Sequence, residues 1–64
     1  MKKLAALRKA RGLSQKELAK MVGVSQTTIA SWEIGTREPN IAKLIQMAEI
    51  FGCTVDELIK KEDT

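Results

Sequence analysis

The segment from Gln15 to Ile34, QKELAKMVGVSQTTIASWEI, restricts the fold more than any other part of the chain. Its first half spaces Leu18 and Val22 four residues apart, as the buried stripe of an amphipathic helix requires. Gly23 then tolerates the left-handed conformation that ends a helix, and Ser25 is a favoured cap for the next one. We therefore predict two short helices joined by a tight corner.

The second of these helices, at about residues 26–33, has two contrasting sides. At about 100° per residue, Ile29, Trp32 and Glu33 fall within one arc, which is expected to face inward. The opposite side and its edges are polar and uncharged, and they carry Gln26, Thr27, Thr28 and Ser31. The interior of a small protein has no need of such a ridge. This layout is that of a helix-turn-helix whose second helix contacts DNA.

The length and the charge of the chain are consistent with one small nucleic-acid-binding domain. The 64 residues are expected to form a single domain at 1–64, with a core at about 4–59 and a frayed tail at 62–64. Residues 1–44 hold nine Lys/Arg and three acids, a net charge of +6, whereas residues 45–64 hold two and five, a net charge of −3. A basic working face suits a polyanion, although an evenly solvated surface is the alternative.

Other function classes find little support in the composition. The single cysteine cannot form an internal disulfide, and no apolar run approaches the length of a membrane span, so we expect a soluble, cytoplasmic protein. The chain has no histidine, no nucleophile–base arrangement, no cluster of metal ligands and no glycine-rich phosphate loop. We therefore expect neither an enzyme nor a cofactor, metal or small-molecule substrate.

The glycines divide the chain into five predicted helices. The four glycines are Gly12, Gly23, Gly35 and Gly52, and each follows a segment whose apolar residues recur with helical spacing. The first helix is expected at about Lys3 to Arg11, and Ser14 and Thr54 open capping boxes for the second and fifth helices. Asn40 is expected to cap the fourth helix. Its predicted apolar stripe comprises Ile41, Leu44, Ile45, Ala48 and Phe51, with Met47 beside it.

Two charged residues are expected to point inward. Arg8 falls on the same arc of the first helix as the inner residue Leu4, and Glu33 falls on the inner arc of the third helix. Because an unpaired buried charge is costly, we predict an Arg8–Glu33 ion pair between these helices. In the alternative, both side chains reach solvent at the edge and never meet.

The combined pattern resembles the Cro and phage-repressor class of helix-turn-helix domains, often called the XRE family. The resemblance extends from about Leu4 to Ile59 and includes the signatures R-G-L-S-Q, W-E-x-G-x-R-x-P and G-x-T-x-D-E-L. It implies an all-α, five-helix domain of the lambda-repressor-like type. It also implies a transcriptional regulator, repressor-like in kind, that binds a double-stranded DNA operator, usually as a homodimer on a palindrome.

The resemblance also carries roles onto individual residues. It implies that Gln26, Thr27 and Ser31 face base edges, and that Gln15, Thr28 and Arg37 lie at the DNA backbone. It further implies that the Arg8–Glu33 pair is a buried salt bridge. Lys16 and Lys20 are either solvated or in contact with phosphate. Because the reading side lacks Arg and Lys, we expect a half-site that contains A·T pairs.

A protein-interaction module is the alternative from another class. Domains of this kind occur as antitoxins and as transcription adaptors, where the polar side can contact protein instead of DNA. Exposed apolar residues on the fourth and fifth helices, such as Ile45, Ile50 or Val55, would then form the docking surface. The same residues would otherwise belong to the core or to a homodimer seam.

Overall fold

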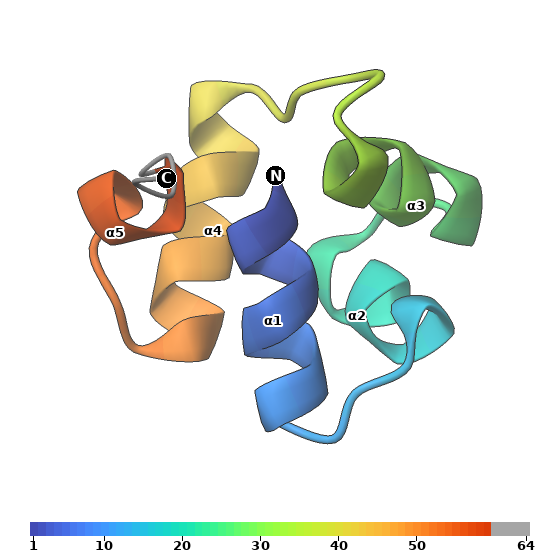
Figure 1. The fold of residues 1–64 in the computed structure, drawn as a ribbon, viewed down its shortest axis with the longest axis horizontal. Coiled ribbons are helices and arrows are strands. Elements are labelled where there is room, and N and C mark those ends of the chain that lie inside the picture. Colours follow the sequence, from blue (N-terminus) through green and yellow to red (C-terminus); the bar gives the residue numbers. More distant parts are fainter. Residues whose placement is uncertain (60–64) are drawn as a thin grey trace.

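The computed structural model describes residues 1–59, and these residues form five α-helices and no strand. The helices are α1 (Lys2–Ala10), α2 (Gln15–Val22), α3 (Gln26–Ile34), α4 (Ile41–Phe51) and α5 (Val55–Ile59). In Figure 1, α1 and α4 occupy the centre, α2 and α3 lie on one side, and α5 lies on the opposite side. The predicted five-helix, all-α class is confirmed, whereas the predicted tail at 62–64 lies outside the described residues.

The helix ends follow the capping pattern of the sequence. Ser14, Ser25 and Asn40 each accept a hydrogen bond from the backbone N–H three residues later. Ser14 and Glu17 form the complete capping box, while Thr54 accepts the corresponding bond from the Glu57 N–H at 3.0 Å. The three glycines that end α2, α3 and α4 are left-handed. α1 begins and ends one residue earlier than expected, a shift within the ordinary uncertainty of helix ends.

One aliphatic core joins all five helices. Its most deeply buried members are Leu4, Leu18, Val22, Ile29, Met47 and Leu58, with Ala19, Trp32 and Phe51 around them. Each helix contributes at least one of these side chains, so no helix is held by its connecting loops alone. The α2–α3 unit is therefore packed against α1 and α4 as part of a rigid body.

The predicted apolar stripe of α4 is wrong at two positions. Ile41 and Ile45 are 64% and 49% exposed, whereas Met47 is fully buried. α4 is turned so that the side chains of Lys43 and Gln46 reach the last carbonyl groups of α2, at 2.9 and 3.3 Å. That rotation carries Met47 into the core and leaves the two isoleucines on the outer edge. Apolar residues surround much of this helix, so their spacing alone did not fix its inner side.

Cationic groups from distant parts of the chain bind the carboxyl ends of three helices. The amino group of Met1 donates to the carbonyl of Trp32 in α3 at 2.7 Å, and Lys43 donates to the carbonyl of Val22 in α2. Arg11 binds the last carbonyl group of α4 at 2.8 Å. Positive charge is favourable at this end of a helix because the unpaired carbonyl groups carry partial negative charge. The contacts of Met1 and Lys43 hold the carboxyl ends of α3 and α2 from outside the pair.

Candidate nucleic-acid interface

α3 presents a polar side outward while its apolar side is anchored in the core. Ile29 is fully buried and Trp32 is 4% exposed, and the helix packs against both α1 and α2. Gln26 and Thr27 are exposed at its amino-terminal end, and Ser31 is half-buried one turn further on. The sequence predicted this orientation. The result is a short, neutral polar ridge on a helix that cannot rotate without losing its core contacts.

The hydroxyl groups on this ridge are partly engaged within the protein. The Ser31 hydroxyl donates to the Thr27 carbonyl at 3.0 Å, and the Thr28 hydroxyl lies 2.9 Å from that of Ser25. Among residues 1–59, no hydrogen bond involves the side chain of Gln26 or Thr27. These two side chains are therefore the ones most readily available to an outside partner.

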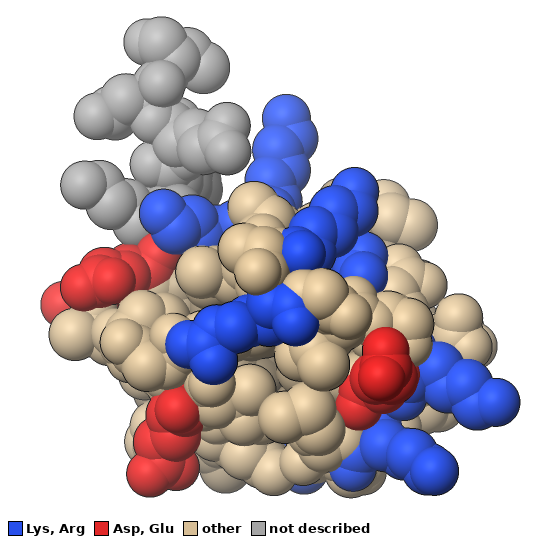
Figure 2. Space-filling model, turned by 90° about the horizontal axis from the view of Figure 1, so that it is seen from below, with Lys and Arg blue, Asp and Glu red and all other residues tan. Residues whose placement is uncertain are grey.

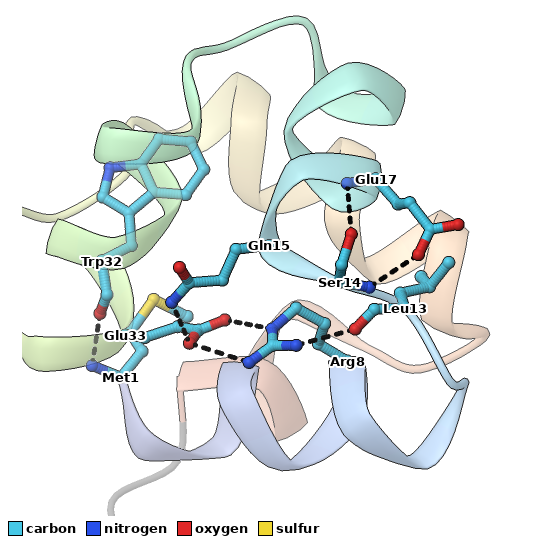
Figure 3. Close-up of polar contacts among 8 residues, drawn as sticks. All are labelled: Met1, Arg8, Leu13, Ser14, Gln15, Glu17, Trp32 and Glu33. Carbon is cyan, nitrogen blue, oxygen red and sulfur yellow. Dashed lines mark hydrogen bonds and ion pairs between the residues drawn. The ribbon is translucent and has the colours of Figure 1, made fainter.

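The predicted Arg8–Glu33 contact is present and joins α1 to α3. Nε of Arg8 lies 2.6 Å from Oε2 of Glu33, and Nη2 donates to Oε1 at 3.3 Å. Nη1 donates to the Leu13 carbonyl at 2.7 Å, and the two charged side chains are only 10% and 8% exposed. Figure 3 shows the guanidinium group lying between the carboxylate and this carbonyl. A two-pronged pair of this kind fixes the separation and the orientation of the two helices.

Gln15 is tied to the same carboxylate. Its Nε2 donates to Oε1 of Glu33 at 3.1 Å (Figure 3), and the side chain is half-buried at the start of α2. An ionised carboxylate only accepts hydrogen bonds, so Glu33 determines which end of the Gln15 amide faces it. One of the two Nε2 protons remains for another acceptor. Glu33 thus holds both the scaffold residue Arg8 and a residue predicted to lie at the DNA backbone.

The ionisation of Glu33 reflects this position. Burial alone would raise the pKa of Glu33, but the hydrogen bonds from Arg8 and Gln15, together with the positive charges of Arg8 and Lys9, lower it below its ordinary value of 4.5. The carboxylate is therefore ionised at neutral pH and remains able to accept all three hydrogen bonds.

Exposed positive side chains lie on α2 and in the loop after α3. Lys16, Lys20 and Arg37 are all exposed, the first two on α2 and the third in the loop after α3. Figure 2 views the molecule from the side that carries the α1–α2 connection, and lysine and arginine side chains are spread over it with acidic groups at separate places between them. The elements next to α3 along the chain thus carry exposed cations, Lys16 and Lys20 before it and Arg37 after it. This distribution suits contact with a phosphate backbone on either side of a groove.

One exposed residue of α3 was missed by the sequence analysis. Ile34 is 76% exposed, the highest value among the large apolar side chains of residues 1–59. It follows Thr27 by seven residues and Ser31 by three, so it lies on the same side of the helix. Ile34 was missed for two reasons. The helix was expected to end at about Glu33, and an apolar residue is ordinarily assigned to the inner side of a helix. Its position on the helical wheel was the signal that could have found it.

Other kinds of site are not evident in the described part of the chain. Residues 1–59 contain no group of three or more His, Cys, Asp or Glu side chains arranged to hold a metal ion. None of the five helices is long and apolar enough to traverse a lipid bilayer.

Comparison of the sequence with known protein families shows which family the chain belongs to. A family model described as helix-turn-helix matches residues 4–58, which include all five helices except the first two residues of α1 and the last residue of α5. The chain belongs to the XRE family of helix-turn-helix domains. Proteins similar to the chain include transcriptional regulators and a phage repressor, so the chain is a helix-turn-helix domain of the DNA-binding XRE type.

Two curated relatives are longer than this chain. It is 39% identical to the HTH-type transcriptional activator BcrR of Enterococcus faecalis over 61 residues, which are 95% of this chain and 30% of that protein. It is 35% identical to the HTH-type transcriptional regulator AnsR of Bacillus subtilis over 60 residues, 94% of this chain and 52% of that protein. The chain therefore spans about a third to a half of the length of these relatives.

A solved structure with the same fold contains DNA. The P22 c2 repressor protein, crystallised in complex with a synthetic operator, superposes with a TM-score of 0.88 at 36% identity. The match covers 95% of this chain and 92% of that one. The five helices are thus arranged as in a repressor domain that binds an operator, which confirms the predicted lambda-repressor-like fold.

Proposed function

We propose that this chain is a sequence-specific transcriptional regulator, repressor-like in kind, that inserts α3 into the major groove of an operator. The observation that carries the proposal is the two-sided structure of α3. Its inner side is locked by Ile29 and Trp32, while Gln26 and Thr27 project from its amino-terminal end into solvent. A major groove about 12 Å wide admits one such helix, and side chains at its amino-terminal end reach base edges first.

The proposal divides the polar residues between two tasks. The base readers are Gln26, Thr27 and Ser31, and the backbone contacts are Gln15, Lys16, Thr28 and Arg37. The Gln amide can form two hydrogen bonds with adenine, one to its N7 acceptor and one from its N6 donor. The Thr methyl group can contact the methyl group of thymine. The absence of Arg and Lys from the outward side of α3 removes the commonest contact to guanine, so we propose a half-site that contains A·T pairs.

Binding as a homodimer to a palindrome is part of the proposal. One helix that reads three or four base pairs supplies little binding energy, and a two-fold dimer places two such helices about 34 Å apart, one turn of DNA. The exposed isoleucine of α4, Ile45, lies on a helix other than α3 and offers apolar surface for self-association. As a regulator of this kind, the protein would act in the cytoplasm.

The alternative function, a protein-interaction module, has weaker support in the structure. Of the three residues that it requires on the surface, only Ile45 is exposed, whereas Ile50 and Val55 are half-buried. Stoichiometric copurification with a second protein, together with no DNA selectivity, is the result that would favour this alternative.

Selection of bound duplexes from a random pool tests the proposal. We expect a symmetric consensus with two A·T-containing half-sites about one helical turn apart. Gel-shift titration of the selected duplex at several salt concentrations should show affinity that falls steeply as salt rises, because phosphate contacts release counterions. Binding that ignores both sequence and salt would reject the proposal.

A further inference from the structure

The most exposed large apolar side chain of residues 1–59 lies on the proposed reading side of α3. Ile34 is 76% exposed and is the last residue of the helix. Seven residues at about 100° each bring it within about 20° of Thr27 on the helical wheel. Thr27, Ser31 and Ile34 therefore form one line along the outward side, separated by four and then three residues.

The length of this line matches the spacing of base pairs. From Thr27 to Ile34 the helix rises about 10.5 Å, and successive base pairs are about 3.4 Å apart. The line can therefore extend over about three base-pair steps of a groove that receives α3. Ile34 would occupy its carboxyl-terminal end, beyond the residues assigned to base reading.

Side-chain chemistry limits what Ile34 can recognise. It has no donor or acceptor, so it cannot read the hydrogen-bonding edge of any base. The major groove offers one apolar group, the C5-methyl group of thymine, which is the established partner of apolar side chains there. We propose that Ile34 is a specificity-determining residue that contacts a thymine methyl group at the outer end of the half-site. This inference rests on the proposed function.

Exposure alone does not carry this inference, because single exposed isoleucines are common on protein surfaces. Ile59 is such a residue, 49% exposed on α5, at the opposite side of the molecule from α3 (Figure 1). What distinguishes Ile34 is its register with Thr27 and Ser31. Ile59 supplies a matched control, since Ile59→Ala removes the same side-chain atoms from an exposed helical site off the reading side.

The test removes one methyl group at a time from the DNA. The probe is the duplex that the wild-type chain selects from a random pool, together with copies in which single thymines are replaced by uracil. At one thymine, replacement should weaken wild-type binding about fourfold, the value of one buried methyl group. Ile34→Ala should bind the thymine duplex more weakly and lose its response to uracil at that position. Ile34→Val and Ile59→Ala should both keep the response.

The failures of the two proposals are distinguishable. If wild type and Ile34→Ala bind the selected duplex and respond alike to uracil at every thymine, Ile34 reads no methyl group, while the proposed function stands. If the pool yields no preferred duplex, the proposed function fails first and this inference fails with it. Thermal melting of each variant verifies that these exposed substitutions leave the fold unchanged.

Discussion

Gln15 and Glu33 lie 18 residues apart, and a hydrogen bond of 3.1 Å from the Gln15 amide to the Glu33 carboxylate joins them. The same carboxylate pairs with Arg8, so a single buried acid links α1, the start of α2 and the end of α3. The residue proposed to lie at the DNA backbone is therefore held by the helix proposed to read the bases. This relationship makes the geometry of the DNA-contacting unit depend on the charge of Glu33.

Removing one partner of the Arg8–Glu33 ion pair should destabilise the fold far more than removing both partners. Arg8→Met leaves the Glu33 carboxylate buried beside the core without its counter-charge, and we expect a loss of about 3 kcal/mol in the free energy of unfolding. Arg8→Met combined with Glu33→Met should recover much of that loss, because no charge remains buried. Urea unfolding at pH 7 measures both. A loss below about 1 kcal/mol in the single variant would contradict the burial described here.

Stability should depend on pH through Glu33. Its pKa is lower in the folded chain than its ordinary value of 4.5, so folding favours the ionised form. This contribution is fully present above pH 4.5 and is lost as the pH falls through the lowered pKa. Urea unfolding from pH 7 downward should show the free energy of unfolding decline below about pH 4.5. Glu33→Gln should show a shallower decline; an equal slope would assign the acid sensitivity to other carboxylates.

The α2–α3 corner should not tolerate a larger side chain. Ala19 is 4% exposed, and its carbonyl accepts hydrogen bonds from both Gly23 and Val24, so Ala19→Leu must displace tightly packed neighbours. We expect a loss of about 1–3 kcal/mol or more in stability. Ala6→Leu, at an exposed position of α1, is the matched control and should change stability little. Equal melting temperatures for the two variants would disprove the close approach of the helices.

On the outward side of α3, substitutions should weaken DNA binding and leave stability nearly unchanged. Thr27→Ala and Ser31→Ala remove no core contact, so each should leave the melting temperature nearly unchanged and weaken binding to the selected duplex by about 1–3 kcal/mol per lost base contact. Circular dichroism melting and gel-shift titration separate the two effects. An early-melting variant with normal affinity would mean that the helix is oriented differently from the structure.

Features that depend on spacing within one helix could be predicted from the sequence. The corner at Gly23, the capping box at Ser14 and the inward direction of Arg8 each follow from a local pattern. The partner of Arg8 was also predictable, because a buried charge requires an opposite one and Glu33 is the inward acid of the neighbouring helix. The outward ridge of α3 followed from the same wheel.

Apart from the Arg8–Glu33 pair, features that depend on how separate helices meet could not be predicted. On α4, Ile41 and Ile45 were wrongly assigned to the inner side, with Met47 only beside it, because apolar residues lie around much of that helix and only its contact with α2 decides between them. The bond from Gln15 to Glu33 and the binding of Lys43 to the end of α2 likewise need the relative positions of two helices. No periodicity within one segment contains that information.

Base-by-base affinity provides the most direct test of the central claim, that a rigid aliphatic scaffold holds the side chains of α3 outward to read bases. Wild type, Thr27→Ala and Lys16→Met are titrated against every single base-pair change in the selected duplex. We predict that Thr27→Ala loses discrimination at one position only, while Lys16→Met weakens binding to all duplexes equally and lowers the salt slope by about one. A uniform loss of affinity for Thr27→Ala, with discrimination intact at every position, would contradict the account.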